Sequence, residues 1–484
     1  MQAVILVPGI MGTRLILPHA DDPNHGSEIW PPTPAETQFG YNRIYELQDD
    51  RVVPSEVIYN VLCFKFYSTL RDLVGELGFK PGGKDQCYFD FAYDWRRDLF
   101  DTADSLAKKI TEIHLAGAQE IIILAHSMGG LVSRLVLESG KFDSQPWFGN
   151  IRMLVSMAVP HLGAPLALAR IFGTDNALGI RSADFTKLAR NPKYPSGYQL
   201  IPAPGEMTVW DIGAVGLPAL DIYDPDTARK LGMEPKLVER ARAVHNVLSR
   251  DKQPSQVRYF YFGGSGHKTA TRVNVYLGAD DSADHSRSIV TRTPDGGDGT
   301  VPLYSALAHR GQRQIVFNEH STVFSGTPFK RVLFRLLGSN AGSPIEAENL
   351  MRIRADEGAP IDTGLNTKMV SPEPYVRVSV DGLMQKVGEP VEVNLSFHNN
   401  ISCSDGDAEV VRIAIVEGKL IFDKVEAEDR IERGYCSVPV SYTGAPVERL
   451  TMYLPPQDAP GIFILRFRGN LKSEGDAKFA ITSA

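Results

Sequence analysis

A serine flanked by small residues stands between a predicted strand and a predicted helix. Residues 120–124 form an apolar run typical of a buried strand, and residues 131–139 carry apolar side chains at helical spacing. The segment AHSMG between them carries Ser127. A G-x-S-x-G segment in this setting forms a tight turn that exposes its serine as a nucleophile, and Ala125 keeps the first position small. The alternative is a serine in an ordinary strand-to-helix turn with no chemistry.

Two backbone segments are candidates to bind the negative oxygen that forms when a serine attacks an acyl carbonyl. The turn itself directs the N–H of Met128 toward that oxygen. A second donor is expected from the loop after an early strand, and the apolar run 4–7 leads directly into residues 8–12, PGIMG. Its glycines let the backbone approach the nucleophile, and the N–H of Ile10 is the candidate donor. The alternative is an ordinary glycine turn.

A serine hydroxyl needs a base to accept its proton, and the base needs an acid to fix its tautomer. With this kind of nucleophile turn the chain order is serine, then acid, then histidine. Asp298 lies between glycines in a segment that follows the apolar run 257–262 after an insertion. This position suits a carboxylate that reaches sideways from a tight loop. Asp295 is the second candidate for the acid.

The candidate base is His320, which follows the apolar run 313–317 almost directly. A histidine in the loop after the last strand has the position that the chain order requires. His309 is the close competitor, but it lies on an apparent helix before that run. The sequence therefore favours His320.

The elements that must position these residues alternate along the first 340 residues. Apolar strand-like runs separated by helical stretches indicate a parallel sheet with helices on both faces, and with the serine turn this is an α/β-hydrolase fold. Residues 165–255 lack strand signals and predict a cap insertion over one end of the sheet. A second, irregular insertion is expected at 265–297, and a closing helix at 328–337. The predicted strands are residues 4–7, 88–93, 120–124, 151–157, 257–262 and 313–317.

The pattern changes toward the end of the chain. Residues 341–374 are polar with scattered glycine and proline and predict a linker region. Residues 375–484 show period-two alternation in short runs, which is typical of an all-β sandwich. Nothing in this strand pattern identifies a protein partner for the domain. The predicted strands are residues 375–380, 391–397, 410–422, 437–442, 450–454, 462–467 and 478–481.

Composition narrows the class of protein further. The 484 residues are 43% hydrophobic and 23% charged with a formal net charge of −7, which argues against nucleic acid as a partner. No apolar run approaches the ~20 residues of a membrane helix, and no charged leader precedes the first strand, so a cytoplasmic location is expected. The four cysteines are interpreted as idle thiols, with a Cys403–Cys436 bridge as the alternative. Neither a metal nor a cofactor is predicted.

Five segments together resemble the lecithin:cholesterol acyltransferase and lysosomal phospholipase A family. They are residues 8–14, 93–96, 125–129, 195–202 and 297–301, in the same order along the chain, and the resemblance covers about residues 1–340. It implies that Ser127 is the nucleophile, Asp298 the acid and His320 the base. It also implies an oxyanion hole formed by the N–H groups of Ile10 and Met128.

The resemblance implies a lipid acyl ester as substrate and an acyl-serine intermediate. The acyl group would pass to water in a lipase or phospholipase, or to an alcohol in an acyltransferase. A non-catalytic binding protein on a hydrolase fold is a further alternative. Transient contact with a membrane surface fits such a substrate.

Two local features accompany this interpretation. Asp94 and Arg96 of the YDWR segment are placed to pair and to brace the cap, or to form a purely structural ion pair. Trp30 with the two prolines after it forms an apolar tip near the oxyanion loop that suits insertion into a lipid surface. The alternative for Trp30 is an ordinary aromatic residue in a loop.

Overall fold

The computed structural model divides the chain into two compact units, Met1–Phe324 and Ser325–Ala484. Nearly all of the predicted linker at 341–374 lies outside the described residues, so the domain boundaries at 340 and 375 stay predictions. The described residues are 1–19, 26–33, 36, 40–61, 64–175, 180–278, 281–309, 311–338, 374–380, 384–399, 409–425, 431–454, 456–457, 459–473 and 476–482.

The first unit is built on a six-stranded sheet in which every pairing is parallel. Each of the six runs predicted as strands in this part of the chain contributes one strand, which confirms the α/β-hydrolase fold class. The strands in spatial order are β14 (Gln312–Val316), β11 (Arg258–Gly264), β9 (Ile151–Met157), β8 (Glu120–His126), β1 (Gln2–Val7) and β7 (Gln86–Asp90).

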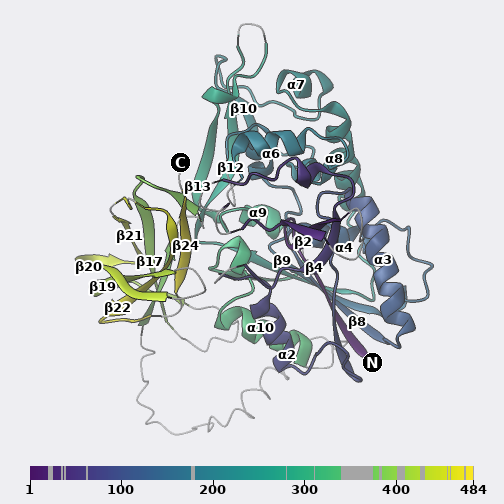
Figure 1. The fold of residues 1–484 in the computed structure, drawn as a ribbon, viewed down its shortest axis with the longest axis horizontal. Helices are drawn as coiled ribbons and strands as arrows, with labels where there is room; N and C mark the ends of the chain where they lie inside the picture. The colour runs from purple at the N-terminus through teal and green to yellow at the C-terminus, as the bar shows by residue number, and fades with distance from the viewer. Residues whose placement is uncertain are drawn as a thin grey trace. The chain divides into compact units, whose positions relative to one another are not determined.

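The central strand β8 and the helix after it form the most buried part of the sheet layer. All residues of β8 except Glu120 are buried, as expected for a parallel strand covered on both faces. Helix α4 (Met128–Glu138) is buried along its whole length and lies beside α3 (Leu99–Leu115) and strands β8 and β9 in Figure 1. Another helix of this unit is α2 (Ser68–Glu76).

The regular elements of the insertion predicted at 165–255 are mostly helices. Its elements are α5 (Pro165–Ile171), α6 (Ser182–Ala189), η3 (Pro195–Leu200), β10 (Val209–Asp211), α7 (Pro225–Lys230) and α8 (Pro235–Leu248). The short strand β10 is an exception to the prediction that no strand occurs here.

The prediction of an irregular insertion at 265–297 is wrong. Strands β12 (His267–Val275) and β13 (Ile289–Gly297) pair in antiparallel fashion, and β10 pairs with β12 to make a three-stranded sheet. The strand pattern was hidden because most of β13 is exposed and needs no apolar side chains. On β12, Ala270 and Val273 are buried. Two register shifts break the regular alternation of buried and exposed residues along this strand.

The two insertions, separate in sequence, share one hydrophobic cluster. Leu168 of α5, Val209 of β10 and Val273 of β12 all belong to it. Helix α8 also reaches the main core, since Val244 and Leu248 pack with the central sheet. These elements lie together in the upper part of the first unit in Figure 1 and form a single cap.

A small sheet near the start of the chain completes the first unit. It contains β2 (Thr13–Pro18) between β3 (Gly26–Trp30) and β4 (Val53–Val57), with both pairings antiparallel. The short element η1 (Glu46–Gln48) precedes β4, and β5 (Asn60–Val61) and β6 (Phe64–Lys65) follow it. Strand β2 begins where the glycine-containing loop after β1 ends, so this sheet supports that loop.

The second unit begins with α10 (Thr327–Gly338) and continues as two β-sheets. Val393 and Leu395 of one sheet share a hydrophobic cluster with Leu465 and Phe467 of the other, so the two sheets pack as a sandwich. All seven predicted runs occur in strands, although the run at 410–422 is divided between two. The strands are β15 (Pro374–Val380), β16 (Met384–Lys386), β17 (Val391–Asn399), β18 (Glu409–Val410), β19 (Ile413–Val425), β20 (Ile431–Val447), β21 (Arg449–Leu454), β22 (Gly461–Gly469), β23 (Lys472–Ser473) and β24 (Ala477–Thr482).

The structure bears on two expectations from composition, the absence of a membrane helix and the state of the cysteines. Within the described ranges, no helix is both long enough and apolar enough to span a bilayer. Cys87 is a buried thiol. Cys436 is a free thiol as well, which contradicts the alternative bridge between Cys403 and Cys436, whereas Cys63 and Cys403 lie outside the described residues.

The buried histidine of α8 predicts a loss of stability in mild acid. His245 donates from Nε2 to the carbonyl oxygen of Ile201 at 2.9 Å, and burial lowers its pKa to about 4. The same side chain in the unfolded protein has a pKa of about 6.5. Between these values the unfolded chain binds more protons than the folded one, so the stability contributed above pH 6.5 is lost as the pH falls.

We therefore expect the free energy of unfolding to decrease from pH 7 to pH 5. His245→Gln, which keeps an N–H donor but cannot titrate, should remove about 2 kcal/mol of that decrease. Urea unfolding followed by circular dichroism at several pH values measures the effect. An unchanged pH dependence in the variant would contradict the assignment of His245 as a buried neutral group.

Candidate active site

The serine turn has the strained geometry expected of a nucleophile at the end of a strand. Ser127 has φ 52° and ψ −129°, a conformation that costs a non-glycine residue roughly 1–3 kcal/mol. Its glycine neighbours are required by close packing. A Cβ on Gly129 would lie 2.4 Å from the carbonyl oxygen of Pro8, and one on Gly130 would lie 2.1 Å from a methyl group of Val159. The small residues of the motif thus let α4 pack against the loops that follow β1 and β9.

The structure brings the three residues predicted as a triad into one hydrogen-bonded chain. His320 Nε2 lies 2.9 Å from Ser127 Oγ, and His320 Nδ1 lies 2.8 Å from Asp298 Oδ2. His320 opens the short helix η5 (His320–Thr322) after β14, as the sequence predicted for a residue past the last strand. Ser127 and Asp298 are buried, and the His320 side chain is largely so.

The carboxylate of Asp298 is held on its other side by backbone donors. Its Oδ1 accepts hydrogen bonds from the N–H groups of Thr300 at 3.0 Å and Val301 at 2.7 Å. The N–H of His320 donates to the carbonyl oxygen of Asp298 at 2.9 Å, which joins the two loops. Asp295, the second candidate, is an exposed residue of β13. The geometry therefore selects Asp298 as the partner of His320.

His309 has a different set of partners. It does not lie on a helix, as the sequence suggested, but in a bend after α9 (Leu303–Ala306). Arg134 donates to its Nε2 at 2.6 Å, and its Nδ1 lies 3.2 Å from Asp251. Burial, together with the charge of Arg134, lowers the pKa of His309 to about 4. Both ring nitrogens thus belong to a separate buried network.

The loop predicted to supply an oxyanion donor lies against the nucleophile. A Cβ on Gly9 would come within 2.8 Å of the Cβ of Ser127, and the loop closes through a hydrogen bond from the N–H of Gly12 to the Gly9 carbonyl oxygen at 3.1 Å. Ile10 is therefore next to a residue that touches Ser127. Met128 is the first residue of α4, where N–H groups have no acceptor within the helix and the helix dipole favours negative charge.

Aromatic side chains hold the carbonyl groups of this loop. Each donor comes from a different part of the chain, and together they fix the loop backbone between β1 and β2. The donors are Tyr93 Oη to Pro8 at 2.7 Å, Trp30 Nε1 to Met11 at 2.8 Å and Trp95 Nε1 to Thr13 at 3.2 Å.

The prediction that Trp30 forms an exposed apolar tip is wrong. Its side chain is 1% exposed and packs edge-on against Trp95 and Tyr41. The indole N–H, which needs an acceptor when buried, finds one in the loop at Met11. Trp30 therefore supports the loop instead of reaching a lipid surface.

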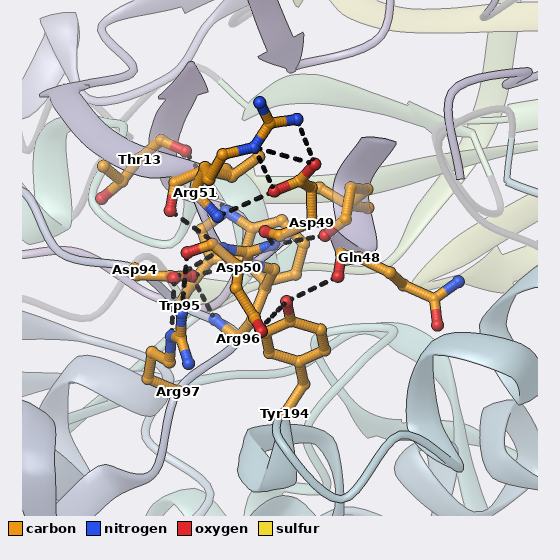
Figure 2. Close-up of polar contacts among 12 residues, drawn as sticks. Thr13, Gln48, Asp49, Asp50, Arg51, Asp94, Trp95, Arg96, Arg97 and Tyr194 are labelled. Atoms are coloured by element: carbon orange, nitrogen blue, oxygen red, sulfur yellow. Dashed lines mark hydrogen bonds and ion pairs between the residues drawn. The ribbon is translucent and has the colours of Figure 1, made fainter. Parts of the chain in front are cut away.

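Asp94 and Arg96 form the pair that the sequence predicted (Figure 2). Arg96 contacts the carboxylate with two nitrogens, Nη2 to Oδ2 at 2.7 Å and Nε to Oδ1 at 2.8 Å. Its guanidinium also donates to the carbonyl oxygen of Val52 at 3.2 Å and stacks on the ring of Tyr194 at 4.5 Å. Since Tyr194 belongs to the cap insertion, the pair links the N-terminal segment to the cap.

Sequence reasoning missed several residues that touch these loops. Tyr67 and His126 contact the oxyanion loop and the base loop, and Thr269 Oγ1 accepts a hydrogen bond from the N–H of Gly299 at 2.9 Å beside Asp298. His126 precedes the nucleophile in the motif, so its position was a usable signal. Tyr67 and Thr269 carry no comparable signal because only folding brings them near the site.

The parallel sheet and the serine turn define the class of protein, an α/β-hydrolase. Residues 60–224 match the family model described as "Lecithin:cholesterol acyltransferase". The match over this segment confirms the resemblance to that family, and the fold is that of an α/β-hydrolase. The matched segment contains Ser127 and Met128, whereas Ile10, Asp298 and His320 lie outside it.

Solved structures similar to this chain include three with low sequence identity. A chain of the Tle4–Tli4 complex is 14% identical, with 70% of this chain and 98% of that chain covered and a TM-score of 0.48. Bacillus licheniformis lipase BlEst2 in mature form is 14% identical over 69% and 91%, with a TM-score of 0.34. Phospholipase PlaB from Legionella pneumophila is 10% identical over 100% and 93%, with a TM-score of 0.30. A search of curated proteins found no match.

The two histidine networks predict opposite results on mutation. His320→Ala should lower the turnover of a short-chain acyl ester about 10³-fold or more, because the base and nucleophile act as a unit. His309→Gln should leave turnover within about threefold, although it removes part of the Arg134 network. Initial rates on a water-soluble ester measure both, with thermal unfolding as the control for folding. Loss of turnover in the His309 variant alone would overturn the choice of base.

Proposed function

We propose that this protein is a serine-dependent hydrolase of lipid acyl esters that works through an acyl-Ser127 intermediate. The observation that carries the proposal is the continuous chain from Ser127 Oγ through His320 to the buried carboxylate of Asp298, with contacts of 2.9 and 2.8 Å. The family described as lecithin:cholesterol acyltransferase supports an acyl ester of a lipid as the substrate.

Each residue has a role in the proposed acylation step. His320 Nε2 takes the proton of Ser127 as Oγ attacks the acyl carbonyl carbon, and Asp298 keeps the proton of His320 on Nδ1 and stabilises the imidazolium. The carbonyl oxygen becomes negative and accepts hydrogen bonds from the N–H groups of Ile10 and Met128. When the tetrahedral intermediate collapses, the imidazolium gives its proton to the departing alcohol. The acyl group is then bound to Ser127.

Deacylation repeats these steps with a second nucleophile. His320 removes a proton from water, the hydroxide oxygen attacks the acyl-serine, and the proton returns to Ser127 Oγ as the fatty acid leaves. An acceptor alcohol in place of water gives an acyltransferase with the same residues, and the family description favours this as the second candidate function. Product analysis with and without added alcohol separates the two functions.

The nucleophile assignment can be tested directly. Ser127→Ala should lower turnover of a short acyl ester about 10³-fold or more while the protein stays folded. A fluorophosphonate probe should label the wild-type protein and not the variant, and mass spectrometry after incubation with mixed phospholipids should show fatty acid release by the wild type only. Near-wild-type turnover in the variant contradicts the assignment. Absence of labelling in the wild type favours a non-catalytic binding protein.

An exposed apolar segment of the cap supports contact with a lipid surface. Residues 213–219, GAVGLPA, contain no charge, and the side chain of Val215 is fully exposed while Leu217 is about half exposed. Met207, before β10, is also exposed. Burial of such side chains in a lipid surface is favourable by roughly 1.5–3 kcal/mol each. We propose that this segment brings the enzyme to its substrate.

The contact predicts a selective loss of activity on vesicles. The double variant Val215→Asp/Leu217→Asp should lower hydrolysis of phospholipid vesicles about 10-fold or more, because apolar burial is replaced by charge, and should leave a soluble ester within twofold. Leu115→Asp, a change at an exposed apolar residue at the end of α3, is the matched control. Equal losses on both substrates would contradict a role limited to the lipid surface.

A further inference from the structure

A second hydrogen-bonded chain joins the three loops of the site without using the triad side chains. The N–H of Gly9 in the oxyanion loop donates to Tyr67 Oη at 2.8 Å, and Tyr67 Oη lies 2.7 Å from His126 Nδ1. His126 Nε2 in turn lies 2.9 Å from the carbonyl oxygen of His320. The chain therefore runs from the oxyanion loop, through the residue before the nucleophile, to the loop of the base.

The two side chains in this series of hydrogen bonds, Tyr67 and His126, are buried and neutral. Tyr67 is fully buried and His126 is 3% exposed. Burial, together with the nearby His320, lowers the pKa of His126 well below its ordinary value, and burial raises the pKa of Tyr67. The ring of Phe324 stacks on Tyr67 and meets His126 edge-on, each at 5.5 Å between centroids. The surroundings thus keep the two polar groups in place and away from water.

Neutrality fixes the direction of every hydrogen bond. A carbonyl oxygen can only accept, so His126 carries its single proton on Nε2 and donates it to His320. His126 Nδ1 is then an acceptor and must receive the hydroxyl proton of Tyr67. Tyr67 Oη, having given its proton to His126, accepts from the N–H of Gly9. Only one placement of protons therefore connects the N–H of Gly9 to the carbonyl oxygen of His320 through these two side chains.

We propose that Tyr67 and His126 are positioning residues that set the oxyanion loop and the base loop against the nucleophile. The proposal rests on the proposed function, because it concerns the geometry of the same reaction. Gly9 precedes the candidate donor Ile10, and the His320 carbonyl belongs to the base itself. A shift of either loop would misalign a group that acts on the reacting atoms, and misplacement by about 1 Å can cost about 100-fold in rate.

The neutral state of His126 also protects the proton transfer. Its ring centroid lies 4.8 Å from that of His320, which becomes positively charged when it takes the serine proton. Among the residues that the structure describes, the titratable groups that contact the His126 side chain are Tyr67 and His320, and neither supplies a negative charge to a protonated His126. A positively charged side chain at this position would therefore oppose formation of the His320 imidazolium.

Three variants test separately the two parts of this hydrogen-bonded chain, from Gly9 through Tyr67 to His126 and from His126 to His320. Tyr67→Phe removes the hydroxyl that links Gly9 to His126. His126→Gln can still present an amide N–H near the Nε2 position for the His320 carbonyl, but loses the acceptor for Tyr67. His126→Asn can present an amide oxygen near the Nδ1 position for Tyr67, but cannot reach His320. Tyr261→Phe is the matched control, because Tyr261 is equally buried and its hydroxyl accepts a hydrogen bond from Gln253 at 3.0 Å.

The readouts are kcat per fluorophosphonate-labelled site, KM, and the pH profile of kcat/KM on a soluble ester. Tyr67→Phe and His126→Gln should lower kcat about 10- to 100-fold with KM within about twofold and the acid limb of the pH profile unchanged. His126→Asn should lower kcat similarly and also move the acid limb, because it releases the base loop. Tyr261→Phe should match the wild type in all three.

Several results would overturn the proposal. One is wild-type kcat per labelled site and an unchanged pH profile in all three variants. Another is an equal loss of kcat in Tyr261→Phe, which would show a general effect of removing buried hydroxyls. Counting labelled sites separates a loss of folded protein from a loss of rate. Absence of labelling in the wild-type protein would instead remove the proposed function itself.

Discussion

The tight turn at Ser127 is the constraint on which the rest of the first unit depends. A buried strand and a buried helix meet there with no room for larger residues, since Cβ atoms on Gly129 or Gly130 would overlap neighbouring atoms at 2.4 and 2.1 Å. The strained backbone at Ser127, which costs roughly 1–3 kcal/mol, is held by the packing of β8 and α4. The cost is tolerated because both elements are almost completely buried.

The parallel sheet explains why residues far apart in sequence meet at this turn. The oxyanion loop follows β1, the serine follows β8, and His320 follows β14, so all three leave the sheet at the carboxyl ends of their strands. Asp298 reaches the same edge by a longer route, through the hairpin of β12 and β13 that continues from β11. This hairpin also contributes to the cap, so the loop of the acid and part of the cap are one continuous segment.

Buried polar side chains then fix the backbone of the loops. Tyr93, Trp30 and Trp95 donate to carbonyl groups of the loop after β1, while Tyr67 accepts from its N–H at Gly9. All four side chains are aromatic, so each adds apolar packing to its hydrogen bond. The ion pair of the buried Arg96 with Asp94 extends this support toward the cap through Tyr194. A loop held in this way keeps its backbone in place before any substrate arrives, which is what the proposed stabilisation of an oxyanion by its N–H groups requires.

The sequence by itself determined the features that depend on local patterns. Runs rich in apolar residues identified all six strands of the sheet. The central strand β8 is apolar because both of its faces are covered, whereas the edge strand β14 is mostly exposed. The small residues around Ser127 and the chain order of serine, acid and histidine selected the three residues that the structure joins by hydrogen bonds.

Tertiary structure alone decided the features that depend on distant partners. The β12–β13 hairpin escaped prediction because its exposed face needs no apolar residues. The burial of Trp30 escaped prediction because its packing partners, Trp95 and Tyr41, are distant from it in the sequence. Tyr67 became part of the site only when folding brought it to His126 and the loop after β1, since a hydrogen bond between side chains 59 residues apart leaves no periodic trace in a sequence.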